Sequence, residues 1–217
     1  MTNPDATIKV WKELLQRSPV LTPAPSTHNE HKLAAGVRDE PILPVKAPAA
    51  STWVWSDLHL GARGVGFAKR QWSEVHARER TILAAWDERV RSTDTIICLG
   101  DVAEPSAIRD ARLVARLREC PGRRVLVIGN HDLLLLKELE EAGFREQTFA
   151  ALCATDPPVA LTHAPLAQIP PGCVHLHGHL HGRGVAAPRR RDVSVDVIGL
   201  APRRLDEILE DLAKDGS

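Results

Sequence analysis

The segment RRVLVIGNHD, residues 123–132, joins a short apolar run to four residues with polar or very small side chains, Gly129-Asn130-His131-Asp132. An apolar run of this length, rich in branched aliphatic residues, is typical of a buried strand. The residues after the run have two interpretations. They could cap a following helix, with Asn130 or Asp132 accepting backbone N–H groups, or they could end the strand at a ligand-binding edge.

The second interpretation is favoured because four other apolar runs end in the same way. In open α/β sheets the carboxyl ends of the strands share an edge, and ligands bind there. We therefore expect the polar side chains at these ends to converge. They follow the runs as Asp57-Leu58-His59, Gly100-Asp101, Thr162-His163 and Gly178-His179-Leu180-His181.

The order of the expected elements indicates the fold class. Apolar positions at helical spacing predict helices over 74–91, 106–119 and 132–142, between the first strands, and a last helix over 203–213. After residue 142, strands are expected over 158–163, 173–179 and 192–200 with no helices between them. Alternating strands and helices followed by a run of strands predict a layered α/β domain with one mixed sheet or two sheets.

The first 50 residues have a different texture. Residues 7–17 carry apolar side chains on one helical face, and the segment that follows, up to about residue 51, is rich in proline and small polar residues. We interpret this segment as an extended or partly disordered arm in which His28 and His31 are solvated. The expected division is an N-terminal helix and arm over 1–50 and one domain over 51–217.

Composition excludes several classes of protein. The 217 residues have no formal net charge, which argues against a protein that coats nucleic acid, and the chain has no tyrosine to serve as a nucleophile. No apolar run is long enough for a membrane span or a signal peptide. The four scattered cysteines predict reduced thiols in a cytoplasmic protein.

The side chains expected at the shared edge have metal-binding chemistry. Carboxylate, imidazole and carboxamide ligands suit divalent ions such as Mn, Fe, Zn or Ni, and the absence of thiolate argues against a structural zinc site. There are too many candidate ligands for one ion, but about enough for two ions that share a carboxylate. A pair of ions stabilises both the attacking and the leaving oxygen in phosphoryl transfer.

These residues resemble the calcineurin-like metallophosphoesterase superfamily. Its motifs D-x-H, G-D, G-N-H-D/E, a histidine after a strand, and G-H-x-H stand here, in order, within residues 55–200. More narrowly, the chain is similar to small bacterial and phage phosphoesterases of that superfamily. The resemblance implies a layered αββα sandwich of two mixed β-sheets flanked by helices.

The resemblance also implies a role for each residue of the motifs. Asp132 would orient His131, the general acid that protonates the leaving oxygen, while a hydroxide between two ions attacks phosphorus. The implied cofactors are two divalent ions, with Mn first and Fe, Zn, Ni or Mg as alternatives. The metal ligands would be Asp57, His59 and His181 for one ion, Asn130, His163 and His179 for the other, and Asp101 for both.

The implied activity is phosphodiester hydrolysis, with some monoester hydrolysis, on a nucleotide-like or other small phosphoester. We expect no membrane partner, and the oligomeric state is open. The G-D motif continues as Val102-Ala103-Glu104-Pro105 rather than the D-R-G of protein phosphatases. The alternatives are an inactive scaffold that keeps the fold and, less favoured, a hydrolase of C–O or C–N bonds.

Two further groups of residues are left open by the motifs. His175 and His177 share one face of the incoming strand, and we interpret them as core or rim residues with hydrogen-bond partners rather than as metal ligands. The basic run Arg189-Arg190-Arg191 is either a solvated face or lies near the metal edge, where it would attract nucleotides or short single-stranded nucleic acid.

Overall fold

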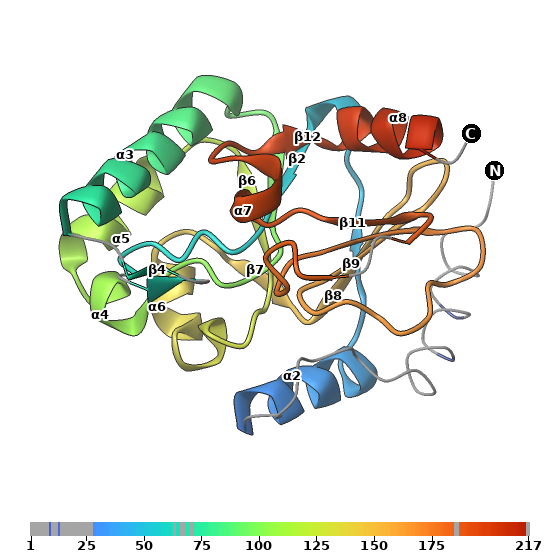
Figure 1. Cartoon of the computed structure of the whole chain (residues 1–217), viewed down its shortest axis with the longest axis horizontal. Helices are drawn as coiled ribbons and strands as arrows, with labels where there is room; N and C mark the ends of the chain where they lie inside the picture. The colour runs from blue at the N-terminus through green and yellow to red at the C-terminus, as the bar shows by residue number, and fades with distance from the viewer. Residues whose placement is uncertain are drawn as a thin grey trace.

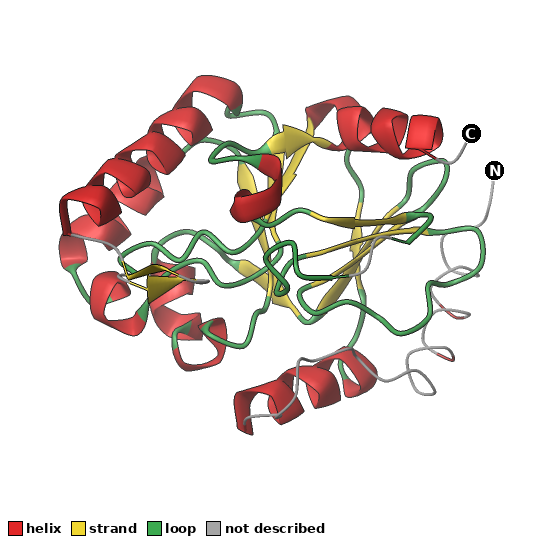
Figure 2. Ribbon diagram, in the orientation of Figure 1, coloured by secondary structure: helices red, strands yellow, loops and turns green. Residues whose placement is uncertain are grey.

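The computed structural model describes Lys9, Glu13 and residues 28–62, 64–65, 68–69, 72–184 and 187–215. Apart from Lys9 and Glu13, the helix expected over 7–17 lies outside these residues. Two five-stranded sheets stand in the middle of the molecule, with helices on their outer sides (Figures 1 and 2). A small hairpin of β3 (Gly64–Val65) and β4 (Ala68–Lys69) lies apart from them.

The first sheet consists of β2 (Thr52–Trp55), β5 (Thr95–Cys98), β6 (Arg123–Val127), β7 (Glu146–Thr148) and β12 (Arg203–Arg204). Its order is β12-β2-β5-β6-β7, and only β12 runs antiparallel to its neighbour. Trp55 is in register with Cys98, and Cys98 with Leu126. The loops after β2, β5 and β6 therefore leave the sheet at one edge, as the sequence predicts.

The second sheet has the order β1-β8-β9-β10-β11. Its strands are β1 (Leu43–Val45), β8 (Ala150–Cys153), β9 (Val159–Thr162), β10 (Val174–His177) and β11 (Arg190–Asp192). β9 and β10 are parallel, so their carboxyl ends also lie together. The strands expected over 158–163 and 173–179 are confirmed, whereas β7 and β8 were not anticipated.

The strand expected over 192–200 is wrong. The strand ends at Asp192, and α7 (Val195–Ile198) follows. The Asp192 carboxylate accepts the N–H of Ser194, and the Ser56 carbonyl accepts the N–H of Val195, so that beyond Asp192 only an isolated bridge between Ser194 and Ser56 forms before the helix. Alternation of valine with polar residues predicted a strand, but these tertiary contacts decide otherwise.

Side chains of alternate residues on each strand divide between the layers. On β2, Trp55 packs in the core beneath the helices, whereas Val54 faces the second sheet. On β8, Ala151 faces the first sheet, whereas Leu152 belongs to the opposite, outer core. This alternation, at the two-residue period of a strand, builds one core between the sheets and one on each outer side. The predicted αββα sandwich is confirmed.

The helices on the first outer side are α3 (Trp72–Arg89), α4 (Pro105–Ile108), α5 (Ala111–Glu119) and α6 (Leu136–Glu141). The helix expected over 106–119 is thus two helices, because Asp110 accepts the N–H of Arg112 and begins a new one. The helix expected over 132–142 is a 3₁₀ turn, η2 (Asp132–Leu134), followed by α6. The last helix, α8 (Leu205–Asp215), is as predicted.

The other outer layer comes from the segment expected to be an extended arm. Residues 28–39 form α2 (His28–Asp39), which buries Leu33 and Val37 against the second sheet, and β1 pairs with β8. The short 3₁₀ helix η1 (Ala49–Ser51) leads into β2. The prediction of an extended arm is therefore wrong from residue 28 to residue 45. Proline content indicated an irregular chain, but two apolar side chains one helical turn apart were enough to dock a helix.

Other expectations for the chain also have an outcome in the described residues. His28 and His31 are exposed, as expected, and all four cysteines are buried free thiols. The division of the chain at residue 50 stays a prediction. Within the described residues, no helix has both the length and the apolar character needed to cross a bilayer.

Candidate metal centre

The backbone at the shared edge has an unusual conformation. Non-glycine residues rarely adopt positive φ, and such strain, on the order of 1–3 kcal/mol per residue, persists where the surrounding structure enforces it, often at functional sites. Five of the seven predicted ligands have positive φ: Asp57 (59°), His59 (42°), Asp101 (55°), His179 (68°) and His181 (49°). Among the described residues, Arg189 is the only other non-glycine residue with positive φ.

The glycines within the motifs allow the loops to approach one another closely. A Cβ atom on Gly129 would lie 2.2 Å from Asp101 Oδ1, and one on Gly178 would lie 2.2 Å from Asp57 Oδ2. No larger residue fits there without moving a predicted ligand. The glycines that mark the motifs in the sequence are thus explained by close packing around the site.

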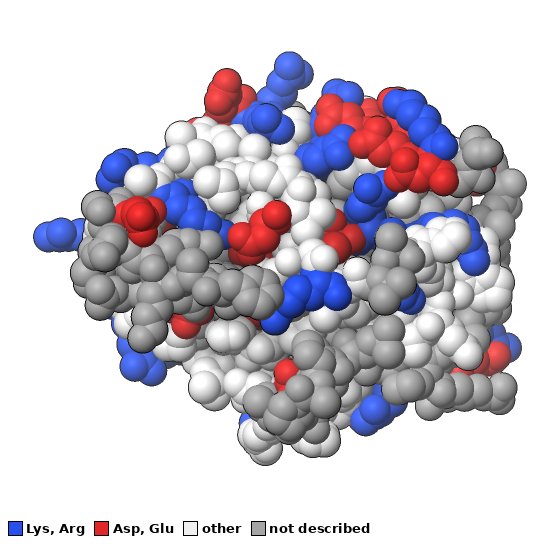
Figure 3. Space-filling view, in the orientation of Figure 1, with Lys and Arg blue, Asp and Glu red and all other residues white. Residues whose placement is uncertain are grey.

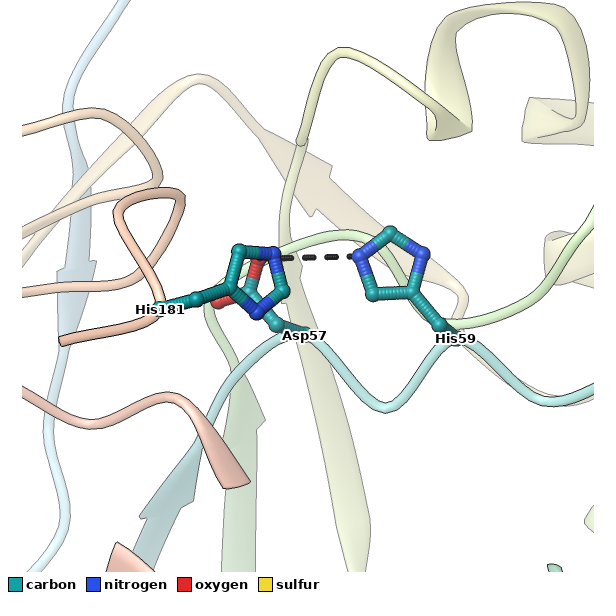
Figure 4. A group of neighbouring side chains, drawn as sticks. All are labelled: Asp57, His59 and His181. Atoms are coloured by element: carbon teal, nitrogen blue, oxygen red, sulfur yellow. Dashed lines mark ion pairs between the residues drawn. The ribbon is translucent and has the colours of Figure 1, made fainter. Parts of the chain in front are cut away.

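Asp57, His59 and His181 form the first cluster. His181 Nε2 lies 3.5 Å from Asp57 Oδ1, and His59 Nε2 lies 3.9 Å from the same oxygen. Figure 4 shows both imidazoles next to the Asp57 carboxylate, and their ring centroids are 5.4 Å apart. One donor atom from each residue lies within 4.8 Å of the others, so the three side chains could hold a metal ion.

A carboxylate holds each histidine of the first cluster from behind. Glu104 Oε1 is 3.0 Å from His59 Nδ1, and Asp196 Oδ2 is 2.6 Å from His181 Nδ1. A proton on each Nδ1 leaves Nε2 with a free lone pair, which is the usual carboxylate–histidine arrangement behind a metal ligand. His59 Nε2 is buried and has no hydrogen-bond partner, which suits a metal ligand.

Asn130, His163 and His179 form the second cluster. Asn130 Oδ1 lies 3.0 Å from His163 Nε2 and 3.1 Å from His179 Nδ1. His163 is fully buried, and its Nδ1 donates to the Leu99 carbonyl at 2.6 Å. His179 Nε2 is buried without a hydrogen-bond partner. Three oxygen or nitrogen donors from three different loops therefore meet here, as the sequence predicts.

Asp101 lies between the two clusters. Its Oδ2 is 3.6 Å from His59 Nε2 and 3.4 Å from His163 Nε2. Its Oδ1 accepts the backbone N–H of His131 at 3.0 Å. One buried carboxylate is thus within reach of histidines from both clusters.

The electrostatics of the metal-free site favour bound positive charge. Burial alone would lower the pKa of His163, but the carboxylates of Asp101 and Asp57 raise it to about 10. Burial would raise the pKa of Asp101, yet the positive charge and hydrogen bond of His163 lower it. In His179 burial lowers the pKa to about 3, so this imidazole is a neutral donor. Carboxylates at this depth need compensating cations, and together with the nitrogen and oxygen donors they fit a divalent metal.

The expected contact between Asp132 and His131 is wrong. Asp132 is fully buried, and its two oxygens accept the backbone N–H groups of Asp101, Val102 and Gly129 at 2.8–3.0 Å. It therefore ties the loops after β5 and β6 together. Asp132 accepts backbone N–H groups, as the helix-capping interpretation expected, but those of two loops rather than those of a following helix. The carboxylate that faces His131 is Glu104, whose Oε1 lies 3.7 Å from His131 Nδ1.

His131 itself lies at the mouth of the site. Its side chain is 43% exposed, and its ring meets the ring of His59 edge-on with centroids 5.0 Å apart. It therefore borders the first cluster and remains open to solvent. His131 could also share a cation with His59 and Glu104, whose donor atoms lie within 4.8 Å of one another.

Two functional partners were missed by sequence reasoning. Glu104 stands in the loop directly after Asp101, and its place in that loop was the available signal. Asp196 was hidden inside a predicted strand, so nothing local marked it. Of the residues left open, His175 is buried with Nε2 2.9 Å from Thr162 Oγ1, and His177 Nδ1 donates to the Gly178 carbonyl at 2.8 Å.

A family model for calcineurin-like phosphoesterases matches residues 50–216. The chain belongs to the calcineurin-like phosphoesterase family. The residues that carry the family's motifs are those that meet at the shared edge. The match begins after α2 and β1, which lie outside it.

Relatives of this chain occur in phages and archaea. The chain is 32% identical over 83 residues to the gene 66 protein of Mycobacterium phage L5. The matched segment covers 38% of this chain and 40% of the phage protein. It is 27% identical over 170 residues to an uncharacterised protein of Methanocaldococcus jannaschii, covering 73% and 89% of the two chains. The matched segment thus spans about two fifths of the phage protein.

A solved structure shares the fold. A protein of unknown function from Aquifex aeolicus superposes with a TM-score of 0.59 at 21% identity, covering 73% of this chain and 97% of that chain. At this identity the likeness shows the fold alone.

Proposed function

We propose that this phosphoesterase hydrolyses phosphodiesters, and monoesters more slowly, in a nucleotide-like or other small phosphoester. The observation that supports the proposal is the position of Asp101, whose Oδ2 lies 3.4–3.6 Å from a histidine of each cluster. Two clusters that share a carboxylate are the arrangement expected for a two-ion phosphoryl-transfer site.

Asp57, His59 and His181 would hold one ion, Asn130, His163 and His179 the other, and Asp101 both. Mixed nitrogen and oxygen donors suit Mn²⁺ first, with Fe, Zn, Ni or Mg as alternatives. When bound, such ions lower the pKa of a water molecule to near neutrality and neutralise charge on phosphoryl oxygens. Asn130 contributes a neutral oxygen, which limits the repulsion between the site and an anionic substrate.

His131 is proposed as the general acid. Its imidazole is partly exposed beside the first cluster, where a leaving oxygen would emerge, and histidine has the proton affinity that such a step needs near neutral pH. Glu104 is proposed to orient it, since its carboxylate faces both His59 and His131. Asp132 is proposed to act indirectly, because its bonds to three amides fix the loops that carry Asp101 and Asn130.

The test is hydrolysis of bis-p-nitrophenyl phosphate by protein titrated with Mn²⁺. We expect metal-dependent cleavage that falls about 10²–10⁴-fold in His131→Ala, while elemental analysis still finds two ions per chain. Absence of hydrolysis of every aryl phosphoester would contradict the proposal. Far fewer than two ions per chain would instead favour an inactive scaffold, and a parallel panel of lactones and thioesters tests the C–O and C–N alternative.

A further inference from the structure

A pocket of about 630 Å³ lies beside β11, outside the two clusters. Its walls come from β10, β11, α7, α8 and the loop after His181, and include His177, Gly182, Arg191, Val197 and Leu212. Binding sites for small molecules usually have volumes of about 300–1,000 Å³ and combine apolar walls with a few polar groups. On the face in Figure 3, acidic side chains gather over α8, and basic side chains lie next to them toward β11.

The pocket begins next to the metal centre. Gly182 follows His181 directly, its N–H donates to Asp192 Oδ2 at 2.9 Å, and a Cβ atom on it would lie 3.1 Å from Val197 Cγ2. Val197 in turn follows Asp196, the carboxylate that holds His181. Gly182, Asp192 and Val197 all line the pocket. A molecule in the pocket would therefore contact residues that are adjacent in sequence to His181 and to Asp196.

His177 offers a hydrogen-bonding group to the pocket. Its side chain is 3% exposed, and Nδ1 donates to the Gly178 carbonyl, which leaves Nε2 as an acceptor. Nε2 has no hydrogen bond to a described residue, and the imidazole lines the pocket. An acceptor that is free at a pocket wall is available to a ligand with an O–H or N–H group.

Three successive arginines give the pocket its charge. Arg189, Arg190 and Arg191 all line it, against two aspartates. Both oxygens of Asp192 accept backbone N–H groups, and Arg191 pairs with the other aspartate, Asp215. Arg189 is exposed and donates from Nη1 to the Cys173 carbonyl at 3.1 Å. Its backbone φ is 60°, in the same strained region as the predicted metal ligands.

The apolar part of the wall suits a flat ring. Val197 is 44% exposed, and only Leu134 is a more exposed large apolar side chain among the described residues. Leu212 of α8 adds a second apolar surface. Aliphatic walls with guanidinium groups beside them accept a planar base, because arginine stacks on aromatic rings and also binds phosphate.

We infer that this pocket binds the nucleoside part of a nucleotide ester whose scissile phosphate lies at the metal centre. The inference rests on the proposed function and narrows its substrate class. The base would pack between Val197 and Leu212, a hydroxyl or N–H group would donate to His177 Nε2, and Arg189 would bind a neighbouring phosphate.

Kinetics with two diesters test this inference. One is the p-nitrophenyl ester of thymidine 5′-monophosphate, which has a nucleoside, and the other is bis-p-nitrophenyl phosphate, which has none. In Val197→Trp the indole fills the pocket, so kcat/KM for the nucleotide ester should fall at least about tenfold, equivalent to about 1.4 kcal/mol. Hydrolysis of bis-p-nitrophenyl phosphate should stay within about twofold of the parent, because its two rings are bound without the pocket.

Arg112→Trp is the matched control, since it adds the same indole at an exposed position of α5 outside the pocket, and it should keep both substrates within about threefold of the parent. Equal loss on both substrates in Val197→Trp, or no loss on either, overturns the inference. If the parent protein hydrolyses neither diester, the proposed function fails, and the binding measurement below still decides the inference.

Binding to metal-free protein separates the pocket from the metal centre. In EDTA, a fluorescent thymidine 3′,5′-bisphosphate, whose second phosphate is the one that Arg189 would bind, should bind measurably, and Arg189→Ala should weaken it at least about fivefold, in line with loss of a charged hydrogen bond. Arg112→Ala, which removes an exposed arginine of α5, should leave binding unchanged. If a short oligonucleotide binds no tighter than the nucleotide, the pocket accepts free nucleotides. If the oligonucleotide binds tighter, the pocket accepts the terminal nucleoside of a nucleic-acid strand. No binding, or equal effects of the two substitutions, overturns the inference.

Discussion

The two ligand clusters of the metal centre are held in place by different physical means. In the first, carboxylates fix the imidazoles, with Glu104 behind His59 and Asp196 behind His181. In the second, a backbone carbonyl fixes His163, and the Asn29 side chain of α2 donates to the carbonyl of Asn130 at 3.1 Å. The first cluster depends on charge, and the second depends on packing and on a helix outside the family match.

The difference extends to burial. The side chains of Glu104 and Asp196 are 26% and 31% exposed, so solvent reaches the groups that orient the first cluster. His163, in contrast, is fully buried. We expect the first cluster to respond to substitution of single carboxylates and the second to respond to proton concentration and to the docking of α2. The predictions below test this contrast.

The largest effect is expected from Asp101→Asn, which removes the carboxylate that both clusters share. Binding of both ions should weaken, and activity on bis-p-nitrophenyl phosphate should fall about a thousandfold, because several kcal/mol of charge stabilisation are lost. Asp87→Asn, at a surface ion pair with Arg116, is the control and should retain full activity. Loss of only one ion in Asp101→Asn would show that the clusters are not joined.

Asp196→Asn and Glu104→Gln should each weaken binding of the ion at the first cluster and leave binding of the ion at the second cluster unchanged. Loss of a carboxylate behind a ligating histidine typically lowers metal affinity about 10–100-fold. Titration calorimetry with Mn²⁺ should therefore resolve one weakened site and one site with the parent affinity. Equal weakening at both sites would contradict the division of the site into two clusters.

Ion binding to the second cluster should depend on pH. Below the raised pKa of about 10, His163 of the metal-free protein is protonated, and it must lose this proton to bind a cation. Binding at pH 7.5 should therefore release about one proton from this residue, and apparent affinity should rise about tenfold per pH unit up to pH 9. Calorimetry in buffers of different ionisation enthalpy measures the release, and pH-independent affinity would sink the prediction.

The smallest effect is expected from Asn29→Ala, which removes the hydrogen bond between α2 and the Asn130 carbonyl. One such bond contributes about 0.5–1.5 kcal/mol, so binding at the second cluster should weaken about 3–10-fold. His28→Ala, exposed in the same turn of α2, is the matched control. If the two variants bind Mn²⁺ equally well, α2 does not support the second cluster.

The packing of α2 explains why the sequence did not predict that this helix contacts the second cluster. Gly36 lies so close to the ring of Phe149 that a Cβ atom on it would be 2.4 Å from that ring, and Asn29 and Asn130 are 101 positions apart. Neither distance leaves a local pattern. A short helix with two buried side chains in a proline-rich segment has too little periodicity to outweigh the composition around it.

The sequence by itself determined the five strand ends and the layered α/β architecture, and its resemblance to the calcineurin-like superfamily selected the seven candidate ligands among the residues at those ends. It could do so because strand periodicity is local and because parallel strands bring their carboxyl ends to one edge. Only the tertiary structure decided which carboxylate faces which histidine. Glu104 rather than Asp132 faces His131, and Asp196 reaches His181 from a segment expected to be a strand. Such pairings depend on how distant loops pack against one another, and no pattern of neighbouring residues encodes that.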